Sequence, residues 1–461
     1  MSKPSIPQGT RDFSPAEVRR RQYILKTLEG IFASYGFQPL ETPAMEQLTT
    51  LTGKYGEEGD RLIFKILNNG LHEKKDKIAL NMEWSQMLDR PYSSPAITER
   101  ALRYDLTIPF ARYVVMHQNE TAFPFRRYQM QPVWRADRPQ RGRYREFWQC
   151  DCDIVGSNAL INEAELLSVY QQAFDQLGIP RVTISINSRK LLQGLASAAG
   201  QPEKMMDITV ALDKFDKIGW EGVSRELDSR GVTTESIAVI EQFINVTGSN
   251  EEKLNAYESL LKDQEDGLKG IAEIRNCLQY HRHLAPEGAR AQIVVDIRLA
   301  RGLNYYTGII LEVTTTAVKM GSIGGGGRYD DLTGLFGLKG MSGVGISFGI
   351  DRIYDVLEEL NLFPEQPGTD STVMVVNFGK EEELYALQIV RRLRLSGIAA
   401  EVFPDNAKFD RQMKYANKRN IPFVILPGEE ERKEGVVSLK DFRTGEQRKH
   451  SIEEVISILK S

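Results

Sequence analysis

Cysteine is scarce in this sequence, with three residues among 461. Cys150 and Cys152 are separated by one residue and Cys277 stands alone, so neither a disulfide framework nor a zinc site of usual spacing can be built. Long apolar runs are also missing, and the segment MSKPSIPQGTRDFSP has neither the apolar centre of a signal peptide nor the Arg- and Ser-rich character of a transit peptide. We therefore expect a protein of the reducing cytoplasm with no membrane partner.

An excess of positive charge is missing as well. The chain has 59 Lys and Arg against 63 Asp and Glu, a net charge of −4, which argues against a protein that coats nucleic acid by bulk electrostatics. Residues 371–461 differ slightly, with 16 basic against 14 acidic side chains, a weak indication of a polyanionic partner. A chain of this length should form about two to four domains.

A capping box opens the first predicted helix. Ser14 and Glu17 have the required spacing, and Pro15 fits the first helical position. Apolar residues follow at near-helical spacing, at Val18, Leu25, Leu28, Phe32 and Tyr35. Gly36 should end the helix, and the PLETP segment after it should be extended at a sheet edge or an interface.

Two segments between residues 125 and 155 alternate with a period of two, which is typical of strands. In FRRYQMQPVWR the polar face carries Arg127, Gln129, Gln131 and Arg135. In FWQCDCDI one face carries Phe147, Gln149, Asp151 and Asp153, and the other carries Trp148, Cys150, Cys152 and Ile154. Joined by the basic loop ADRPQRGRY, they predict an antiparallel hairpin whose polar face floors a wet pocket. Pro132 fits only an edge or a bulge.

The remaining patterns predict the domain organisation. Residues 190–285 are helical and strongly charged, which suggests an inserted helical module between a catalytic core of residues 1–190 and 285–362. NLFPEQPGTDS is rich in turn formers and predicts a linker. Residues 370–461 alternate strands with helices, which is typical of a small, mostly parallel α/β domain.

Six stretches resemble the histidyl-tRNA synthetase family of class II aminoacyl-tRNA synthetases. Residues 14–43 resemble motif 1, VWRADRPQRGRYREFWQCDCDIVG resembles motif 2, and SGVGISFGIDRIYDVL resembles motif 3. ARGLNYYTG and GGGGRYDDL are similar to the two histidine-specific motifs, and LRYDLTIPFARY resembles the eukaryote-like branch. The resemblance implies an α+β fold with an antiparallel catalytic sheet, a helical insertion that helps clasp the acceptor arm, a C-terminal anticodon-binding domain and a homodimer.

The same resemblance implies the chemistry: ATP and L-histidine form an adenylate, and histidine then passes to the 3′ end of tRNA(His). Arg135 and Arg301 match the catalytic positions that hold the α-phosphate, where negative charge develops. Further ATP contacts are expected at Arg143, Phe147 and Arg352. Mg²⁺ should accompany ATP, bound mainly through phosphates and water.

Histidine recognition needs groups that pair with its ammonium and its ring nitrogens. The positions that match the family's contacts to histidine are Asp105, Thr107, Gln149, Asp153, Tyr305, Tyr306 and Tyr329. Asp105 and Asp153 stand where bacterial members commonly carry glutamate, and Asn304 replaces a common aspartate. Arg138 and Gln140 match positions that contact the acceptor end of the tRNA.

Structural explanations compete with several of these assignments. The run Gly324–Gly327 is most simply a plain turn, Asp105 with Thr107 a helix cap, and Cys150 with Cys152 buried small hydrophobes. Arg411, Lys414 and Lys418 share a helical face that serves either RNA contact or solubility. Two other functions also fit parts of the pattern: a synthetase-like regulatory subunit of histidine biosynthesis and a non-catalytic RNA-binding module.

Overall fold

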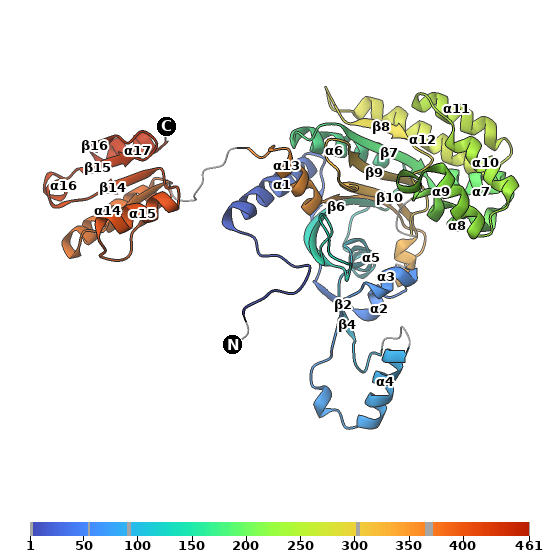
Figure 1. Cartoon of the computed structure of the whole chain (residues 1–461), viewed down its shortest axis with the longest axis horizontal. Coiled ribbons are helices and arrows are strands. Elements are labelled where there is room, and N and C mark those ends of the chain that lie inside the picture. The colour runs from blue at the N-terminus through green and yellow to red at the C-terminus, as the bar shows by residue number, and fades with distance from the viewer. Residues whose placement is uncertain (1–2, 54–55, 90–93, 301–304, 365–371, 461) are drawn as a thin grey trace. The chain divides into compact units, whose positions relative to one another are not determined.

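The computed structural model describes residues 3–53, 56–89, 94–300, 305–364 and 372–460. Its contacts divide the chain into two compact units, Met1–Phe363 and Pro364–Ser461 (Figure 1). Each unit has a buried apolar core of its own. Within the described ranges, no helix has the length and apolar composition needed to cross a membrane.

An eight-stranded sheet forms the centre of the first unit, in the order β1-β5-β6-β11-β10-β9-β7-β8. Its strands are β1 (Gln38–Pro39), β5 (Phe125–Trp134), β6 (Glu146–Val155), β7 (Val182–Ser188), β8 (Gln292–Val295), β9 (Ile309–Thr315), β10 (Gly324–Asp330) and β11 (Ser342–Gly349). The five central pairings are antiparallel, whereas β1 with β5 and β7 with β8 are parallel. The expected antiparallel core is confirmed.

The first helix, α1 (Pro15–Ser34), forms as its cap predicts. The backbone N–H of Ser14 donates to the Glu17 carboxylate across 2.6 Å, and the Glu17 N–H returns a 3.4 Å bond to the Ser14 hydroxyl. Gly36 follows with φ 75°, a conformation that favours glycine. The next residues form the edge strand β1, which pairs with Arg127 and Tyr128 of β5.

The predicted hairpin is β5 with β6, and only part of its polar face is exposed to solvent. Arg127 and Gln129 are fully buried, because the rest of the unit covers the inner half of the face; the Arg127 guanidinium lies 4.2 Å from the Phe110 ring centroid. Pro132 pairs with Trp148 of β6 and lies beyond the short β1. It therefore occupies an edge-like position, as predicted.

Helices cover the sheet and fill residues 189–284. The main helices of this unit are α5 (Thr107–Met116), α6 (Ile161–Gln176), α7 (Arg189–Ala198), α8 (Met205–Leu212), α9 (Phe215–Ser229), α10 (Thr234–Ile244), α11 (Asn250–Leu261), α12 (Glu265–Leu284) and α13 (Ile350–Glu359). Figure 1 shows α7 to α11 gathered at one side of the unit. Their apolar residues, such as Leu227 and Phe243, belong to the same continuous core as the sheet. The 190–285 boundaries therefore remain a prediction.

A smaller sheet bears a projecting segment. It has the order β2-β4-β3, with β2 (Met45–Gln47), β3 (Lys65–Ile66) and β4 (Arg100–Leu102), and is flanked by α2 (Leu48–Leu51) and α3 (Gly56–Arg61). Between β3 and β4, α4 (Lys77–Asp89) buries none of its residues and projects from the unit (Figure 1). Asn68 joins the two ends of this segment next to the sheet. Its amide donates to the Pro95 carbonyl across 2.8 Å, and its Oδ1 accepts from the Glu99 N–H at 3.0 Å.

The second unit is the expected α/β domain. Its elements are β12 (Val373–Val375), α14 (Lys380–Leu395), β13 (Ala400–Val402), α15 (Phe409–Lys418), β14 (Phe423–Leu426), α16 (Glu429–Glu434), β15 (Val437–Asp441), β16 (Gln447–His450) and α17 (Ile452–Lys460). The sheet order is β13-β12-β14-β15-β16. β12 pairs in parallel with β13 and with β14, whereas β15 pairs antiparallel with β14 and with β16. A turn joins β15 to β16, as is usual for antiparallel neighbours.

Candidate active site

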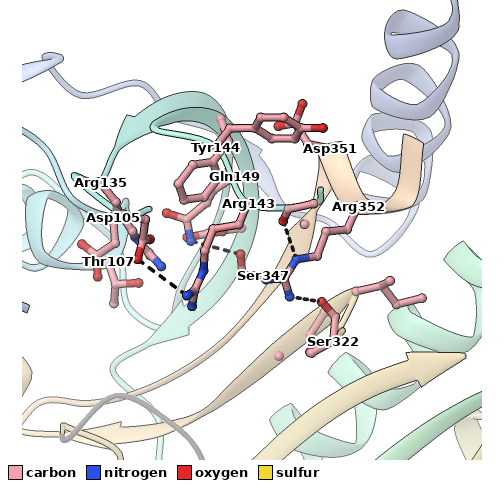
Figure 2. Close-up of a pocket in the computed structure, with 18 of the residues that line it drawn as sticks. Asp105, Thr107, Arg135, Arg143, Tyr144, Gln149, Ser322, Ser347, Asp351 and Arg352 are labelled. Atoms are coloured by element: carbon pink, nitrogen blue, oxygen red, sulfur yellow. Dashed lines mark hydrogen bonds and ion pairs between the residues drawn. The ribbon is translucent and has the colours of Figure 1, made fainter. Parts of the chain in front are cut away.

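A pocket of about 280 Å³ opens over the strands β6, β10 and β11. Nine of the predicted site residues line it: Asp105, Thr107, Arg135, Arg143, Phe147, Gln149, Tyr305, Tyr306 and Arg352. Figure 2 shows Asp105, Thr107 and Arg135 towards one end and Arg352 with Ser322 towards the other, with Arg143 and Gln149 between them. Residues separated by more than 240 positions in the sequence are therefore brought to one cavity.

Arg135, directly after β5, is held in place by its surroundings. Its Nε donates to the Tyr104 carbonyl across 3.0 Å, and its guanidinium lies 4.2 Å from the Tyr104 ring centroid and 5.2 Å from that of Phe147. Aromatic faces attract a guanidinium and restrict its movement. Arg135 is thus a fixed positive charge in the pocket wall, suited to a phosphate.

The loop of the β5–β6 hairpin lines the pocket next to Arg352. Gln140 and Arg143 exchange two backbone hydrogen bonds of 3.0 and 2.9 Å, and Gly142 between them has φ 69°. Arg352, near the start of α13, donates from Nε to the Gly142 carbonyl at 2.8 Å and from Nη1 to the Ser322 carbonyl at 2.6 Å. Arg138 and Gln140 are exposed in this loop and do not line the pocket.

Asp105 marks the opposite end, where α5 begins. Its Oδ1 accepts from the Ile108 N–H at 3.1 Å, and its Oδ2 accepts from the Tyr305 hydroxyl at 3.5 Å. The capping interpretation is therefore correct, and it does not remove the residue from the pocket. Gln149 donates from Nε2 to the Ser347 hydroxyl at 3.3 Å. The Gln149 Oε1 atom is buried and has no hydrogen-bond partner in the described chain, so it remains available to a donor.

Asp153 and Tyr329 lie behind the pocket wall rather than in it. The Tyr329 hydroxyl donates to Asp153 Oδ1 across 2.7 Å, and Arg127 forms an ion pair with Asp153 Oδ2 at 2.8 Å. Burial raises the pKa of the Asp153 carboxyl, and the Arg127 charge opposes that rise. Asp153 Oδ1 thus accepts a hydrogen bond within the protein, whereas Asp153 Oδ2 has the ion pair but no hydrogen-bond partner among the described residues.

The glycine run is a strand, not a turn. Gly324–Gly327 form the first half of β10 between β9 and β11, and none of the four has positive φ. A Cβ on Gly326 would lie 2.2 Å from the Gly345 carbonyl oxygen. The run lets the backbone of a neighbouring strand approach closely, and Gly324 and Gly325 present bare backbone to the pocket.

Several further pocket residues were not assigned a role from the sequence, among them Asp351, Ser347 and Asp151. Asp351 accepts from the Trp148 N–H at 3.1 Å and is paired with Arg11 and, at 2.6 Å, with Arg21. Ser347 and Asp151 are cross-strand neighbours on β11 and β6. The alternation that singled out Gln149 and Asp153 also places Asp151 on their face, so the signal for that residue was present.

The family was decided by comparison with known proteins. A model described as "Histidyl-tRNA synthetase" matches residues 86–353, and one described as "Anticodon binding domain" matches residues 372–461. The histidine–tRNA ligase of Christiangramia forsetii is 55% identical over 449 residues, 96% of each chain. That of Phocaeicola vulgatus is 50% identical and covers 100% of both chains. The chain belongs to the histidyl-tRNA synthetase family.

A solved structure agrees with this assignment. The histidyl-tRNA synthetase from Nostoc sp. PCC 7120 is 30% identical, with a TM-score of 0.81 over 100% of this chain and 99% of that one. The class II catalytic fold with its C-terminal α/β domain is thereby established for the chain. Of the predicted family residues, Arg301 lies outside the described residues, as does Asn304.

Proposed function

We propose that this chain ligates histidine to tRNA(His), with the pocket of the first unit as its active site. A carboxylate oxygen of histidine attacks the α-phosphorus of ATP, the bond to the β-phosphate breaks, and pyrophosphate leaves. The adenylate's acyl group then passes to the 3′ end of the tRNA, and AMP leaves. The observation that carries this proposal is the convergence of Arg135, Arg143 and Arg352 with Asp105 and Gln149 around one cavity.

The three guanidinium groups that line the pocket are suited to the nucleotide. Arg135 is fixed between the rings of Tyr104 and Phe147, where it would stabilise charge on the α-phosphate in the transition state, together with Arg301. Arg143 is half exposed and would reach the terminal phosphates. Phe147 would pack on one face of adenine and Arg352 on the other. Catalysis is then positioning and electrostatics, without a covalent enzyme intermediate.

Histidine is assigned to the end with Asp105. Asp105, Thr107 and the unpartnered Gln149 Oε1 would receive the α-ammonium, and the ring would lie beside Tyr305 and Tyr306. Asp153 and Tyr329 would act on the ring from behind the wall.

Mg²⁺ would neutralise phosphate charge as it enters with ATP. Within the described ranges, no group of three or more His, Cys, Asp or Glu side chains is placed to hold a metal ion. We expect the ion to be held mainly by phosphate oxygens and water.

The tRNA would contact both units. Arg138 and Gln140 are exposed in the hairpin loop, where they would contact the acceptor end of the tRNA. On α15, Arg411, Lys414 and Lys418 are exposed, which suits contact with anticodon phosphates. We also propose a homodimer that uses residues 14–43, which sedimentation analysis would test.

Histidine-dependent exchange of pyrophosphate into ATP tests the activity. The wild-type chain should catalyse it, and Arg135→Ala should slow it by about two to three orders of magnitude, because a fixed transition-state charge is lost. Arg290→Ala, at an exposed ion pair with Asp175, is the matched control and should retain full exchange. A wild-type chain that binds tRNA but shows no exchange would refute the proposal and favour a non-catalytic module.

A further inference from the structure

The segment before α1 lies along the loop of the β5–β6 hairpin and has no part in the reaction proposed so far. The backbone N–H of Arg145 in the loop donates to the Gly9 carbonyl at 2.9 Å, and its Nη1 atom donates to the Gln8 carbonyl at 3.4 Å. Gly9 has φ 85°, and a Cβ at this position would lie 2.8 Å from Arg145 Cγ. The segment and the loop are therefore closely packed, although 137 residues of sequence separate Gln8 from Arg145.

Arg11 of this segment contacts two parts of the pocket wall. Its guanidinium carbon lies 3.3 Å from the ring centroid of Tyr144 in the loop, and its Nη2 atom pairs with Asp351 near the start of α13. Tyr144 and Asp351 both line the pocket (Figure 2), whereas Arg11 does not. Arg11 therefore holds the loop and the helix from outside the pocket, where it does not reach a ligand.

Asp351 accepts hydrogen bonds from several parts of the chain. It is 4% exposed, and its Oδ1 atom accepts from Arg11 and, at 2.6 Å, from Arg21 of α1. Its Oδ2 atom accepts from the Trp148 N–H at 3.1 Å. Of the two arginines, Arg11 is the one stacked on Tyr144. The link between this buried carboxylate and the loop therefore depends on Arg11.

The two residues that Arg11 contacts are next in sequence to arginines assigned to ATP. Arg143 precedes Tyr144 in the loop, and Arg352 follows Asp351 on α13. A guanidinium held by an aromatic face and by a buried carboxylate has little freedom to move. Arg11 therefore fixes the distance between the loop and the helix, and with it the spacing of the two arginines. A displacement of about 1 Å can reduce the effect of such a group by about 100-fold.

Arg352 also joins the helix to the loop, through the 2.8 Å hydrogen bond from its Nε atom to the Gly142 carbonyl. That side chain is assigned to adenine as well, so its bond to the loop has to coexist with the ligand. Arg11 has no second task of this kind. It can therefore hold the loop in the same place before and after ATP binds.

We propose that Arg11 is a positioning residue for nucleotide binding: it holds the hairpin loop against the start of α13, so that Arg143 and Arg352 bind ATP together. This rests on the proposed function, because it takes ATP as the occupant of the pocket. The segment before α1 is then part of the structure that forms the active site.

Arg11→Ala tests the proposal in pyrophosphate exchange. KM for ATP should rise about tenfold, because the two arginines no longer meet the nucleotide in a fixed arrangement. Asp105 lies towards the opposite end of the pocket from Arg352 (Figure 2), so KM for histidine should change less than about twofold. An equal rise in both KM values would indicate a general loss of structure and overturn the proposal, as would an unchanged KM for ATP.

Arg20→Ala is the matched control. Arg20 also joins α1 to α13, since its Nη1 atom lies 3.0 Å from Glu358 Oε1, but this pair is exposed and near the other end of α13. Both KM values should stay within about twofold of the wild type. Arg11→Lys retains a positive charge beside Asp351 without the planar group over Tyr144, so its KM for ATP should lie between those of the wild type and Arg11→Ala. An equal effect of Arg20→Ala and Arg11→Ala would contradict the role of Arg11.

A double-variant cycle tests whether Arg11 acts through the loop. Tyr144→Leu removes the stacked ring, so in that chain Arg11→Ala should raise KM for ATP less than about threefold, against about tenfold in the wild type. The same factor in both chains would place the effect of Arg11 elsewhere and overturn the proposal.

Limited digestion with trypsin measures the position of the loop without an activity assay. Cleavage after Arg141 or Arg143, identified by mass spectrometry, should be about tenfold faster in Arg11→Ala than in the wild type, because the loop is released. Unchanged cleavage would overturn the proposal. A wild-type chain without histidine-dependent exchange would instead refute the proposed function, whereas faster cleavage in Arg11→Ala would still support the role of Arg11 in holding the loop.

Discussion

The Nε atom of Arg352 donates a hydrogen bond to the carbonyl oxygen of Gly142 across 2.8 Å. The bond joins the start of α13 to the loop of the β5–β6 hairpin, which also carries Arg143. The side chain proposed to stack on adenine therefore also positions the loop proposed to reach the terminal phosphates. Nucleotide binding and loop position depend on the same guanidinium.

Removing that guanidinium should weaken ATP binding. We expect Arg352→Ala to raise KM for ATP about tenfold to hundredfold in pyrophosphate exchange, because charge-assisted hydrogen bonds of this kind contribute about 1.5–3 kcal/mol. Arg141→Ala is the control: Arg141 lies in the same loop and pairs with Glu359 of the same helix, but it is 62% exposed. It should change KM less than twofold. Equal effects of the two changes would contradict the assigned role of Arg352.

Gly326→Ala should destabilise the first unit. The new Cβ would meet the Gly345 carbonyl oxygen at 2.2 Å and Ile346 Cα at 2.7 Å, and neither backbone atom can move without separating β10 from β11. We expect a loss of about 1–3 kcal/mol, measured by urea unfolding. Gly30→Ala on α1, where an added Cβ would meet nothing within 4 Å beyond the helix's own backbone, should stabilise the protein by about 0.5–1 kcal/mol. Similar unfolding curves for both variants would disprove the packing argument.

Arg328 and Glu163 form a buried ion pair that should be sensitive to truncation. Arg328 Nη2 lies 2.7 Å from Glu163 Oε2, and Glu163 is fully buried. Arg328→Met should cost about 3–5 kcal/mol in unfolding free energy, because it leaves the carboxylate without its partner. The double variant Arg328→Met, Glu163→Gln should recover part of that loss. No recovery would mean that the cost comes from packing instead.

Asp151 should make stability depend on pH in the direction opposite to most paired carboxylates. An unfolded aspartate titrates near 3.9, and the pKa of Asp151 is raised to about 7 by burial. Between these values the folded state binds more protons, so this group's stabilisation, complete below pH 4, is lost as pH rises to about 7. Asp151→Asn removes that loss. At pH 8 the variant should unfold at a higher urea concentration than the wild type. Its free energy of unfolding should be larger by about 2–4 kcal/mol, and this difference should shrink at pH 5.

Asp351→Asn is the control for that measurement. It weakens the ion pairs with Arg11 and Arg21, so it should lower stability at pH 5 and at pH 8 alike. If Asp151→Asn also lowers stability at both pH values, its carboxyl is not destabilising when charged.

The elements with strong local signals could be predicted from the sequence. The capping box at Ser14 and Glu17, the alternation that gave β5 and β6, and the strand–helix alternation after residue 370 all depend on neighbours within a few positions. The pocket residues came from motif matches, and nine of them converge. Local chemistry and motif spacing together therefore located most of the candidate site.

The remainder depends on contacts that no local pattern contains. Asp153 and Tyr329 were both expected near the histidine ring, which stays a prediction, but the hydrogen bond that joins them across 176 residues of sequence was not foreseen. The glycine run favoured a turn on propensity alone; it is a strand, in which a Cβ on Gly326 or Gly327 would lie 2.2 or 2.7 Å from a carbonyl oxygen of a neighbouring strand. The Arg352–Gly142 bond joins segments 210 residues apart. In each case tertiary packing decided which of several local possibilities formed.

The projecting α4 offers a use in protein engineering. Ile66 of β3 and Arg100 of β4 are paired in register, and Asn68 is hydrogen-bonded to Pro95 and Glu99 next to them. The chain therefore leaves and re-enters the small sheet at almost the same point. A foreign domain whose two termini lie close together needs that kind of junction. A fluorescent reporter domain inserted after Asn68 in place of α4 would label the chain internally. Both ends of the chain would then remain available for other tags.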